Sequence, residues 1–357
     1  MITGVAATAA LGAAVSWGVV ALVRDAAVRR GLLDVPNARS SHATATPRLG
    51  GLGIIAATLV ALAVGPVLLG LEGGASLKLV ALGMVVAAVS LIDDLRGLPA
   101  LARLVVHLAA GAAAVAMLGP LDIAAAIGLA DPPSALALNR GLTVLWIAGF
   151  MNAFNFMDGI DGIAAGQGAV AGAAIAVLGW LLEVPPAMLL GLALAAACLG
   201  FLPHNWSPAT IFMGDVGSAF VGFLLATAPL VPPAHQDAPI GVLPFALIVW
   251  PFLFDTTLTF IRRAARGENV LAAHRSHLYQ RLTQAGWSHA RVAALYTALA
   301  AVTAVLVASP PAQGRTSTTI ILVAAAGAVG LWSLVVHAER QRQTGRDRRT
   351  VEDSFRA

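Results

Sequence analysis

Eleven apolar runs of membrane-spanning length constrain this chain more than any other feature of its sequence. A helix that crosses the hydrocarbon core of a bilayer needs about 20 apolar residues, so each run predicts one transmembrane helix. The runs lie at residues 2–23, 50–71, 75–93, 101–119, 138–156, 162–182, 187–202, 218–231, 239–261, 291–309 and 316–338. Membrane β-barrels are built instead from alternating segments of about ten residues. We therefore predict an all-α polytopic membrane protein with about eleven transmembrane helices.

The composition excludes most soluble classes of protein. Apolar residues make up 58% of the chain and charged residues only 11%, whereas charged residues are about 25% of a typical soluble domain. The single cysteine, Cys198, lies in an apolar run, which excludes a disulfide framework and a cysteine metal cluster. The sequence pI of about 10.2 is high, but the basic residues follow the membrane topology, so we expect no nucleic-acid partner.

Lysine and arginine predict the orientation of the helices. With the N-terminus outside, 19 of these residues fall on the inner side and only three, Lys78, Arg140 and Arg315, on the outer side. This asymmetry is typical of a membrane protein whose basic loops face the cytoplasm. We therefore expect the C-terminus to be cytoplasmic. Residues 1–338 are predicted to form one integral-membrane catalytic domain, and residues 339–357 a basic cytoplasmic tail that contacts anionic lipid.

Aspartates gather at the predicted inner ends of the helices. Ionisable residues at a membrane are costly and usually functional, and six of them come from four separate stretches: Asp93, Asp94, Asp158, Asp161, Asp215 and Asp255. The topology places these six at one depth but leaves their lateral convergence open. We predict that chemistry takes place on the cytoplasmic face.

The first two of these stretches suggest cation or nucleotide binding. Asp93 and Asp94 stand at a helix C-terminus, whose partial negative charge requires a compensating cation or a cationic substrate group; Arg96 or Arg103 is the alternative partner. On a helix, Asn152, Asn155 and Asp158 share roughly one face, and glycines follow them. Such oxygens suit a base and ribose or a hard cation, with a polar turn as the alternative.

The other two stretches suggest anion binding. Gly214 and Gly217 flank Asp215, which indicates close approach to phosphate or metal, although a helix cap is the simpler interpretation. His274 and His277 lie on one face if that segment is helical. Arg275 and Arg281 supply forked donors suited to phosphate, with positive-inside charge as the alternative. No P-loop motif is present.

Taken in order, these motifs resemble one family, the polyprenyl-phosphate N-acetylhexosamine-1-phosphate transferases. The matching segments are residues 34–42, 47–51, 93–94, 155–162, 205, 208–209, 212–218 and 274–282. The resemblance implies an eleven-helix enzyme of the bacterial inner membrane with a cytoplasmic active site. Its reaction moves a sugar-1-phosphate from a UDP-N-acetylhexosamine to undecaprenyl phosphate and releases UMP. The reaction depends on Mg²⁺, for which Mn²⁺ can substitute.

The resemblance also assigns roles to residues. It implies that Asn155 and Asp215 bind the metal, that Asp158 and Asp161 belong to the uridine pocket, and that Asn205 binds substrate. Asp93 and Asp94 are associated with the acceptor phosphate. We expect Asp93, Asp94 and Asp215 to be catalytic. We expect the diphosphate to be held by residues of the last inner loop, His274, Arg275, His277 and Arg281.

Departures from one branch of the family narrow the substrate. Phospho-N-acetylmuramoyl-pentapeptide transferases typically carry a lysine soon after the paired aspartates and three histidines in the last inner loop, whereas here Arg96 follows the pair. The chain looks most like the group that initiates O-antigen on UDP-GlcNAc or a 6-deoxy-N-acetylhexosamine. The pentapeptide transferase is the alternative within the family, and a lipid or solute transporter the alternative class. A homodimer is left open.

Overall fold

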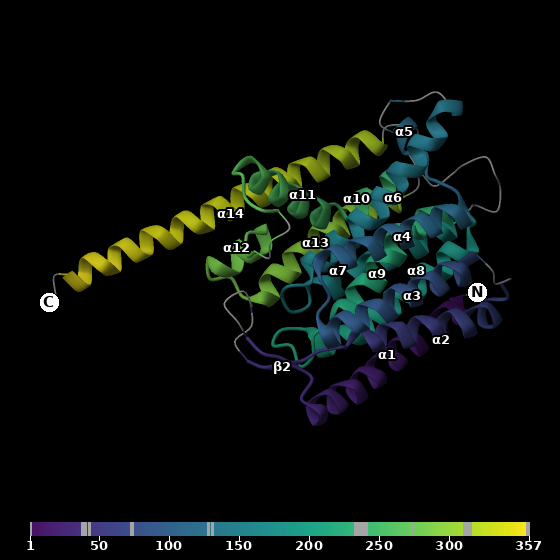
Figure 1. The fold of residues 1–357 in the computed structure, drawn as a ribbon, viewed down its shortest axis with the longest axis horizontal. Helices are drawn as coiled ribbons and strands as arrows, with labels where there is room; N and C mark the ends of the chain where they lie inside the picture. Colours follow the sequence, from purple (N-terminus) through teal and green to yellow (C-terminus); the bar gives the residue numbers. More distant parts are fainter. Residues whose placement is uncertain are drawn as a thin grey trace.

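The computed structural model describes residues 2–36, 41, 44–71, 75–126, 129, 132–231, 242–270, 272, 274–309 and 316–354, most of them in helices (Figure 1). The helices in chain order are α1 (Ile2–Arg30), α2 (Gly51–Leu69), α3 (Ala75–Arg96), α4 (Ala100–Leu118), α5 (Ile123–Ala126), α6 (Pro132–Met157), α7 (Ile163–Leu181), α8 (Pro185–Asn205), α9 (Asp215–Thr227), the 3-10 turn η1 (Ala228–Leu230), α10 (Val242–Ile248), α11 (Trp250–Ala265), α12 (Leu278–Gln284), α13 (His289–Val307) and α14 (Thr316–Ser354). The prediction of an all-α polytopic membrane protein is confirmed.

Every predicted run contains helix, but not every run is a straight membrane span. Among the described residues, seven helices are long and apolar enough to cross a membrane, or eight if the bent pair α10 and α11 counts as one. The run predicted at 239–261 breaks between those two helices with a bend of 84°. Pro251 stands in the first turn of α11, and proline there has no amide to continue a helix from α10.

Glycines allow the centre of the bundle to pack closely. Helices α7 and α8 are the most buried of the long helices. A Cβ atom on Gly172 of α7 would lie 2.6 Å from the Ala195 amide nitrogen and 2.8 Å from the Gly191 carbonyl oxygen of α8. Small residues at such contacts bring helix backbones together where lipid supplies no hydrophobic drive for association.

A short two-stranded sheet lies at one end of the bundle. Strands β1 (Leu33–Asp34) and β2 (Thr46–Pro47) pair antiparallel, and no sequence pattern predicts them. Part of the family-like segment 34–42, and Arg315 of the predicted outer side, lie outside the described residues. The sheet leads directly into α2, so it fixes the chain beside the start of that helix.

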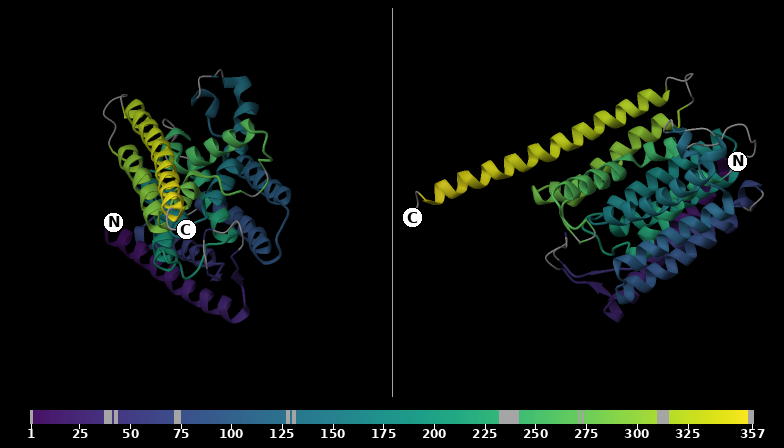
Figure 2. Two further views of the ribbon diagram at one scale, coloured as in Figure 1. Left: turned by 90° about the vertical axis from the view of Figure 1, so that its left-hand side faces the viewer. Right: turned by 45° about the horizontal axis from the view of Figure 1, so that its top comes forward.

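Helix α14 extends beyond the rest of the bundle (Figure 2). It projects on the same end of the molecule as β2 and α12 (Figures 1 and 2). One continuous helix therefore joins the predicted last span to the basic tail, across the predicted boundary at residue 338.

Candidate active site

A cavity of about 570 Å³ opens among the ends of α3, α6 and α9. Its lining includes six aspartates, Asp34, Asp93, Asp94, Asp158, Asp161 and Asp215. Only two arginines, Arg48 and Arg103, share the lining, so the described walls carry an excess of negative charge. Five of the six aspartates singled out in the sequence thus converge, and such a cluster favours a cation at its centre.

Asp94 anchors the helix that carries Asp215. Its carboxylate oxygens accept hydrogen bonds from the backbone amides of Asp215 and Val216, at 3.1 and 2.9 Å. These amides belong to the first turn of α9 and have no partner within the helix. The structure therefore corrects the simpler interpretation of Asp215 as a helix cap, because the cap comes from α3. Gly214, with φ of 77°, brings the chain close to that carboxylate.

Asp215 and Asn155 touch inside the cavity. The Asn155 Nδ2 atom donates to Asp215 Oδ1 at 2.7 Å and to Ser218 Oγ at 2.8 Å. An amide group presents its oxygen in the same place after a 180° rotation. The two residues predicted as metal ligands therefore lie within coordinating reach of one another.

Arg103 lies between the two predicted catalytic regions. Its Nη1 atom is 3.3 Å from Asp93 Oδ2 and 3.1 Å from Asp215 Oδ2. The other Asp93 oxygen accepts the Leu98 amide. Asp93 Oδ2 itself is buried and has no hydrogen-bond partner among the described residues. Such an atom is ready to receive a proton or a cation.

The donor set fits a magnesium ion that is completed by substrate. In the described part of the chain, no three histidine, cysteine or acidic side chains by themselves form a metal site. Mg²⁺ usually takes only one or two carboxylates and fills its octahedron with water and substrate phosphates. Asp215 and Asn155 match that requirement.

A second side of the cavity is formed by the loop after α6. Burial works to raise the pKa of Asp161, but the hydrogen bond and charge of His289 and the Ala209 amide outweigh it and lower that pKa. The His289 Nδ1 atom is 3.3 Å from Asp161 Oδ2. The neighbouring Asp158 has its pKa raised well above the usual range, first by burial and then by the carboxylates of Asp215, Asp94 and Asp161.

Asn205 lines the cavity, but both ends of its side-chain amide form hydrogen bonds to the protein backbone. Its Oδ1 atom accepts the Gly162 amide at 3.0 Å, and its Nδ2 atom donates to the Ile211 carbonyl at 3.1 Å. It therefore joins the loop after α6 to the loop before α9. We conclude that Asn205 shapes the walls of the cavity, whether or not it also contacts substrate.

The remaining predicted residues lie beside the cavity and do not line it. His274, Arg275, His277 and Arg281 are absent from its lining, where their neighbour Gln280 appears instead. The segment from 274 to 277 is not helical, although the rings of His274 and His277 lie close together, with centroids 4.9 Å apart and planes tilted by 30°. Arg281 points away and pairs with Glu339 of α14 at 2.6 Å.

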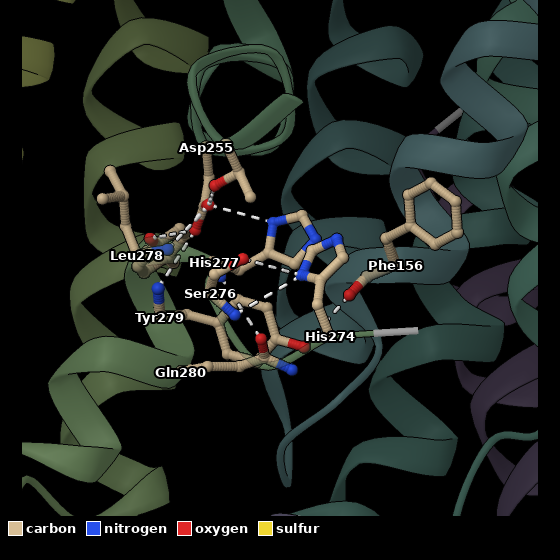
Figure 3. A network of polar contacts seen from close by, with 10 residues as sticks. Phe156, Asp255, His274, Ser276, His277, Leu278, Tyr279 and Gln280 are labelled. Carbon is tan, nitrogen blue, oxygen red and sulfur yellow. Dashed lines mark hydrogen bonds and ion pairs between the residues drawn. The ribbon is translucent and has the colours of Figure 1, made fainter. Parts of the chain in front are cut away.

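Asp255 organises this segment from within the protein (Figure 3). It is fully buried, and so it does not join the other five aspartates. Its carboxylate accepts His277 Nδ1 at 3.1 Å and the amides of Leu278 and Tyr279 at 2.8 and 3.1 Å. The Tyr279 hydroxyl in turn donates to the Phe156 carbonyl at 3.0 Å, which connects α12 to the end of α6.

Several lining residues were not among the predicted site residues: Asp34, Arg48, Arg103, Gln280 and His289. Arg48 stood in a family-like segment, and Arg103 was considered only as a partner that neutralises the paired aspartates. His289 begins α13, far along the chain from Asp161, and no local pattern indicates their contact.

Comparison with known proteins bears on what such a cavity does. Residues 76–232 match the family model described as Glycosyl transferase family 4. The chain is 36% identical over 305 residues to the decaprenyl-phosphate N-acetylglucosaminephosphotransferase of Mycolicibacterium smegmatis, covering 76% of this chain and 74% of the relative. It is 30% identical over 269 residues to a probable undecaprenyl-phosphate N-acetylglucosaminyl 1-phosphate transferase of Bacillus subtilis, covering 75% and 74%. A phospho-N-acetylmuramoyl-pentapeptide-transferase of Enterococcus faecalis is 38% identical, but over 31% of this chain and 33% of its own length.

Proposed function

We propose a specific reaction for this chain, which belongs to the polyprenyl-phosphate N-acetylhexosamine-1-phosphate transferases of glycosyl transferase family 4. The reaction moves N-acetylglucosamine-1-phosphate from UDP-N-acetylglucosamine to undecaprenyl phosphate and releases UMP. The names of the long-aligned relatives favour N-acetylglucosamine over a 6-deoxy sugar. Because the alignment to the pentapeptide transferase is shorter, we keep that activity as the alternative. Initiation of O-antigen or another surface polysaccharide stays a prediction.

The observation that carries this proposal is the contact of Asp215 with both Asn155 and Arg103 inside the acidic cavity. Both substrates are anionic phosphates, and their repulsion must be offset when they meet in a partly dehydrated site. Asp215 and Asn155 would hold Mg²⁺, which supplies Lewis-acid charge neutralisation to the diphosphate when bound. Arg48 and Arg103 add fixed positive charge on the same walls.

The hydrogen bonds divide the roles of the paired aspartates. Both oxygens of Asp94 are used by the first amides of α9, so Asp94 positions Asp215. Asp93 keeps one oxygen without a hydrogen bond, and it accepts any residual proton from the acceptor phosphate. An acceptor oxygen attacks the sugar-proximal phosphorus, and the bond from that phosphorus to the bridging oxygen breaks. UMP leaves with the bridging oxygen, so one phosphoanhydride replaces another without ATP.

The loop after α6 is the proposed nucleotide subsite. Asp161, held by His289 and the Ala209 amide, presents a fixed acceptor on the cavity wall. The carboxylates of Asp161 and Asp215 both act on Asp158 and help to raise its pKa, and a bound cation would lower that pKa. We therefore propose that the base binds near Asp161 and the diphosphate near Asp215.

We also propose that the cavity faces the cytoplasm of a bacterial inner membrane. The basic C-terminal part of α14 projects at the same end of the molecule as β2 and α12 (Figure 1). Asp34 of β1, the strand that pairs with β2, and Gln280 of α12 line the cavity, so the cavity lies at this basic end, and basic segments favour the cytoplasmic side of a membrane. UDP-sugars are soluble, so a cavity at this end reaches the donor from water and the acceptor from lipid.

The test is a transfer assay with the purified full-length chain. UDP-N-acetylglucosamine labelled in the sugar is incubated with undecaprenyl phosphate and Mg²⁺, and butanol-extractable label and UMP are both measured. We expect the two products in equal amounts, and loss of both after chelation of divalent ions or in Asp215→Asn. Activity that survives chelation would contradict the metal assignment.

Two further experiments distinguish the proposed reaction from the pentapeptide transferase and from a transporter. A panel of UDP-sugars that includes UDP-N-acetylmuramoyl-pentapeptide should show transfer from UDP-N-acetylglucosamine and little from the pentapeptide donor. Preferred use of the pentapeptide donor would assign the chain to that branch. Uptake of label into sealed vesicles without lipid-linked product would indicate a transporter instead.

A further inference from the structure

His289, the first residue of α13, lines the cavity from a distant part of the sequence. Residues at intervals of four share one face of a helix, and on this face Ala293 and Thr297 follow His289. A Cβ atom on Gly162, at the start of α7, would lie 3.8 Å from the Ala293 Cβ atom. A Cβ atom on Gly166 would collide with the Thr297 hydroxyl oxygen. The close packing of α13 on α7 therefore determines where His289 stands on the cavity wall.

The contact between His289 and Asp161 orients the imidazole ring. The His289 Nδ1 atom is 3.3 Å from Asp161 Oδ2, and the same oxygen accepts the Ala209 amide at 3.2 Å. The Ser207 hydroxyl is a further donor to this carboxylate. Because three protein donors hold the carboxylate in place, it can fix the direction of the ring. The hydrogen bond that one ring nitrogen makes also determines which nitrogen carries the proton.

The other ring nitrogen of His289 is open to a ligand. The Nε2 atom makes no hydrogen bond with a described residue, and it is not buried. The side chain is 18% exposed and lines the cavity, so this atom opens into the cavity. A neutral imidazole that donates from Nδ1 carries a lone pair on Nε2. The atom therefore accepts an N–H or O–H group and repels another lone pair.

We propose that His289 Nε2 accepts a hydrogen bond from the N3–H group of the uracil base of the donor nucleotide. This inference rests on the proposed function, in which the base binds near Asp161. Uracil carries a hydrogen at N3, whereas cytosine has a lone pair there. Cytosine would leave two lone pairs facing each other, and a site built around one hydrogen bond rejects such a ligand. Asp161 is then a positioning residue, and His289 is the group that contacts the base.

The test measures nucleotide binding by the purified full-length chain. UMP, CMP and 2′-deoxy-UMP are titrated by calorimetry with Mg²⁺ at about pH 8, where an imidazole is ordinarily neutral. We expect the unmodified chain to bind UMP about tenfold more tightly than CMP, the effect of one unsatisfied hydrogen-bonding group. His289→Asn keeps an amide near the place of Nδ1, beside Asp161, but it has no acceptor at the place of Nε2. It should bind UMP about tenfold less tightly and no longer prefer UMP to CMP.

Two other variants complete the design. His289→Gln brings its amide oxygen near the place of Nε2 and should keep part of the preference for UMP, and it provides a result even if His289→Asn does not fold. Arg291→Gln is the matched control: it removes a positive charge two residues away, from an exposed side chain that lies 3.7 Å from the centroid of the Trp287 ring and does not line the cavity. Its preference for UMP should equal that of the unmodified chain.

Three outcomes would overturn the inference. An unchanged ratio of UMP to CMP affinity in both His289 variants would mean that the residue only joins α13 to the loop after α6. A changed ratio of UMP to 2′-deoxy-UMP affinity, with an unchanged ratio of UMP to CMP, would move the contact to the ribose. Failure of the proposed function itself looks different, because the unmodified chain would then bind no UMP and form no lipid-linked product.

Discussion

Tyr279 shows how a residue outside the cavity can govern the position of residues inside it. Its amide is bound by Asp255 at 3.1 Å, and its hydroxyl donates to the Phe156 carbonyl at 3.0 Å. Phe156 follows Asn155 directly in the chain. A Cβ atom on Gly159 would lie only 2.0 Å from the Tyr279 hydroxyl oxygen, so the glycine at this point permits the contact. The buried carboxylate thus determines where the predicted metal ligand stands.

Tyr279→Phe should reduce kcat/KM about tenfold, because a small displacement of a positioning group is costly to catalysis. It should also raise the Mg²⁺ concentration that gives half-maximal activity. The matched control is Tyr296→Phe, which removes a hydroxyl that donates to the same Asp255 carboxylate at 2.6 Å. We expect the control to lower stability by about 1 kcal/mol and to leave the Mg²⁺ requirement unchanged. Identical Mg²⁺ titrations for the two variants would contradict this role.

Arg103 competes with any cation for the Asp215 carboxylate. Its removal in Arg103→Gln should strengthen Mg²⁺ binding about threefold, a modest effect because the side chain is 38% exposed and solvent screens it. The measurement is the rise in thermal unfolding temperature during a Mg²⁺ titration of the substrate-free protein. Arg96→Gln removes an equal charge from an exposed side chain that does not line the cavity and should bind as the unmodified chain does. Weaker Mg²⁺ binding by Arg103→Gln would show that the arginine supports the cation site.

The helices lie along the chain where the apolar runs predict them, but their exact starts and bends were predicted less well. Apolar length located every long helix, because burial in lipid demands about 20 apolar residues whatever the tertiary contacts. The predicted eighth span, 218–231, begins instead at Asp215, because Asp94 from another helix satisfies its first amides. The bend before Pro251 could have been predicted from the proline itself. The β1–β2 pairing could not, because strands of two residues are too short to show an alternating pattern.

The close contact between α2 and α9 leads to a prediction about the position of helix α9. A Cβ atom on Gly51 would lie 2.2 Å from the Gly217 Cα atom and 2.5 Å from its nitrogen. Gly51→Ala should therefore push the start of α9 away, destabilise the protein by about 1–3 kcal/mol and displace Asp215. Thermal unfolding and the transfer assay together measure both effects. Gly18→Ala, where a Cβ meets nothing within 4 Å, is the control and should leave both unchanged.

For the molecule as a whole, the topology predicted at which depth in the membrane the aspartates lie, but it could not predict whether they meet in one site. Positive-inside charge placed six aspartates at one level, and five of them do meet in a single cavity. Asp255 sits at the same end, but its helix directs it toward Tyr296 and α12. Which side of a helix faces a shared cavity depends on packing between helices, and a single sequence does not reveal that. His289 was missed for the same reason, whereas Arg103 was expected as a possible partner of the paired aspartates and does contact Asp93 at 3.3 Å.

The orientation of the whole chain can be tested with cysteines, because Cys198 is buried and should not react in the unmodified protein. Val67→Cys, exposed near the end of α2, is predicted outside. Gln343→Cys, exposed on the projecting part of α14, is predicted inside. In intact cells a membrane-impermeant maleimide should label the first and spare the second until the membrane is opened. The reverse pattern would invert the predicted topology.

The bond from Asp94 to the first amides of α9 spans 121 and 122 residues of chain. During synthesis the paired aspartates therefore enter the membrane long before the helix that neutralises them has left the ribosome. A nascent chain that stops short of Asp215 carries unneutralised charges at the lipid boundary and lacks the proposed catalytic centre. Truncated products of this gene should accordingly be inert and prone to removal by membrane quality-control proteases.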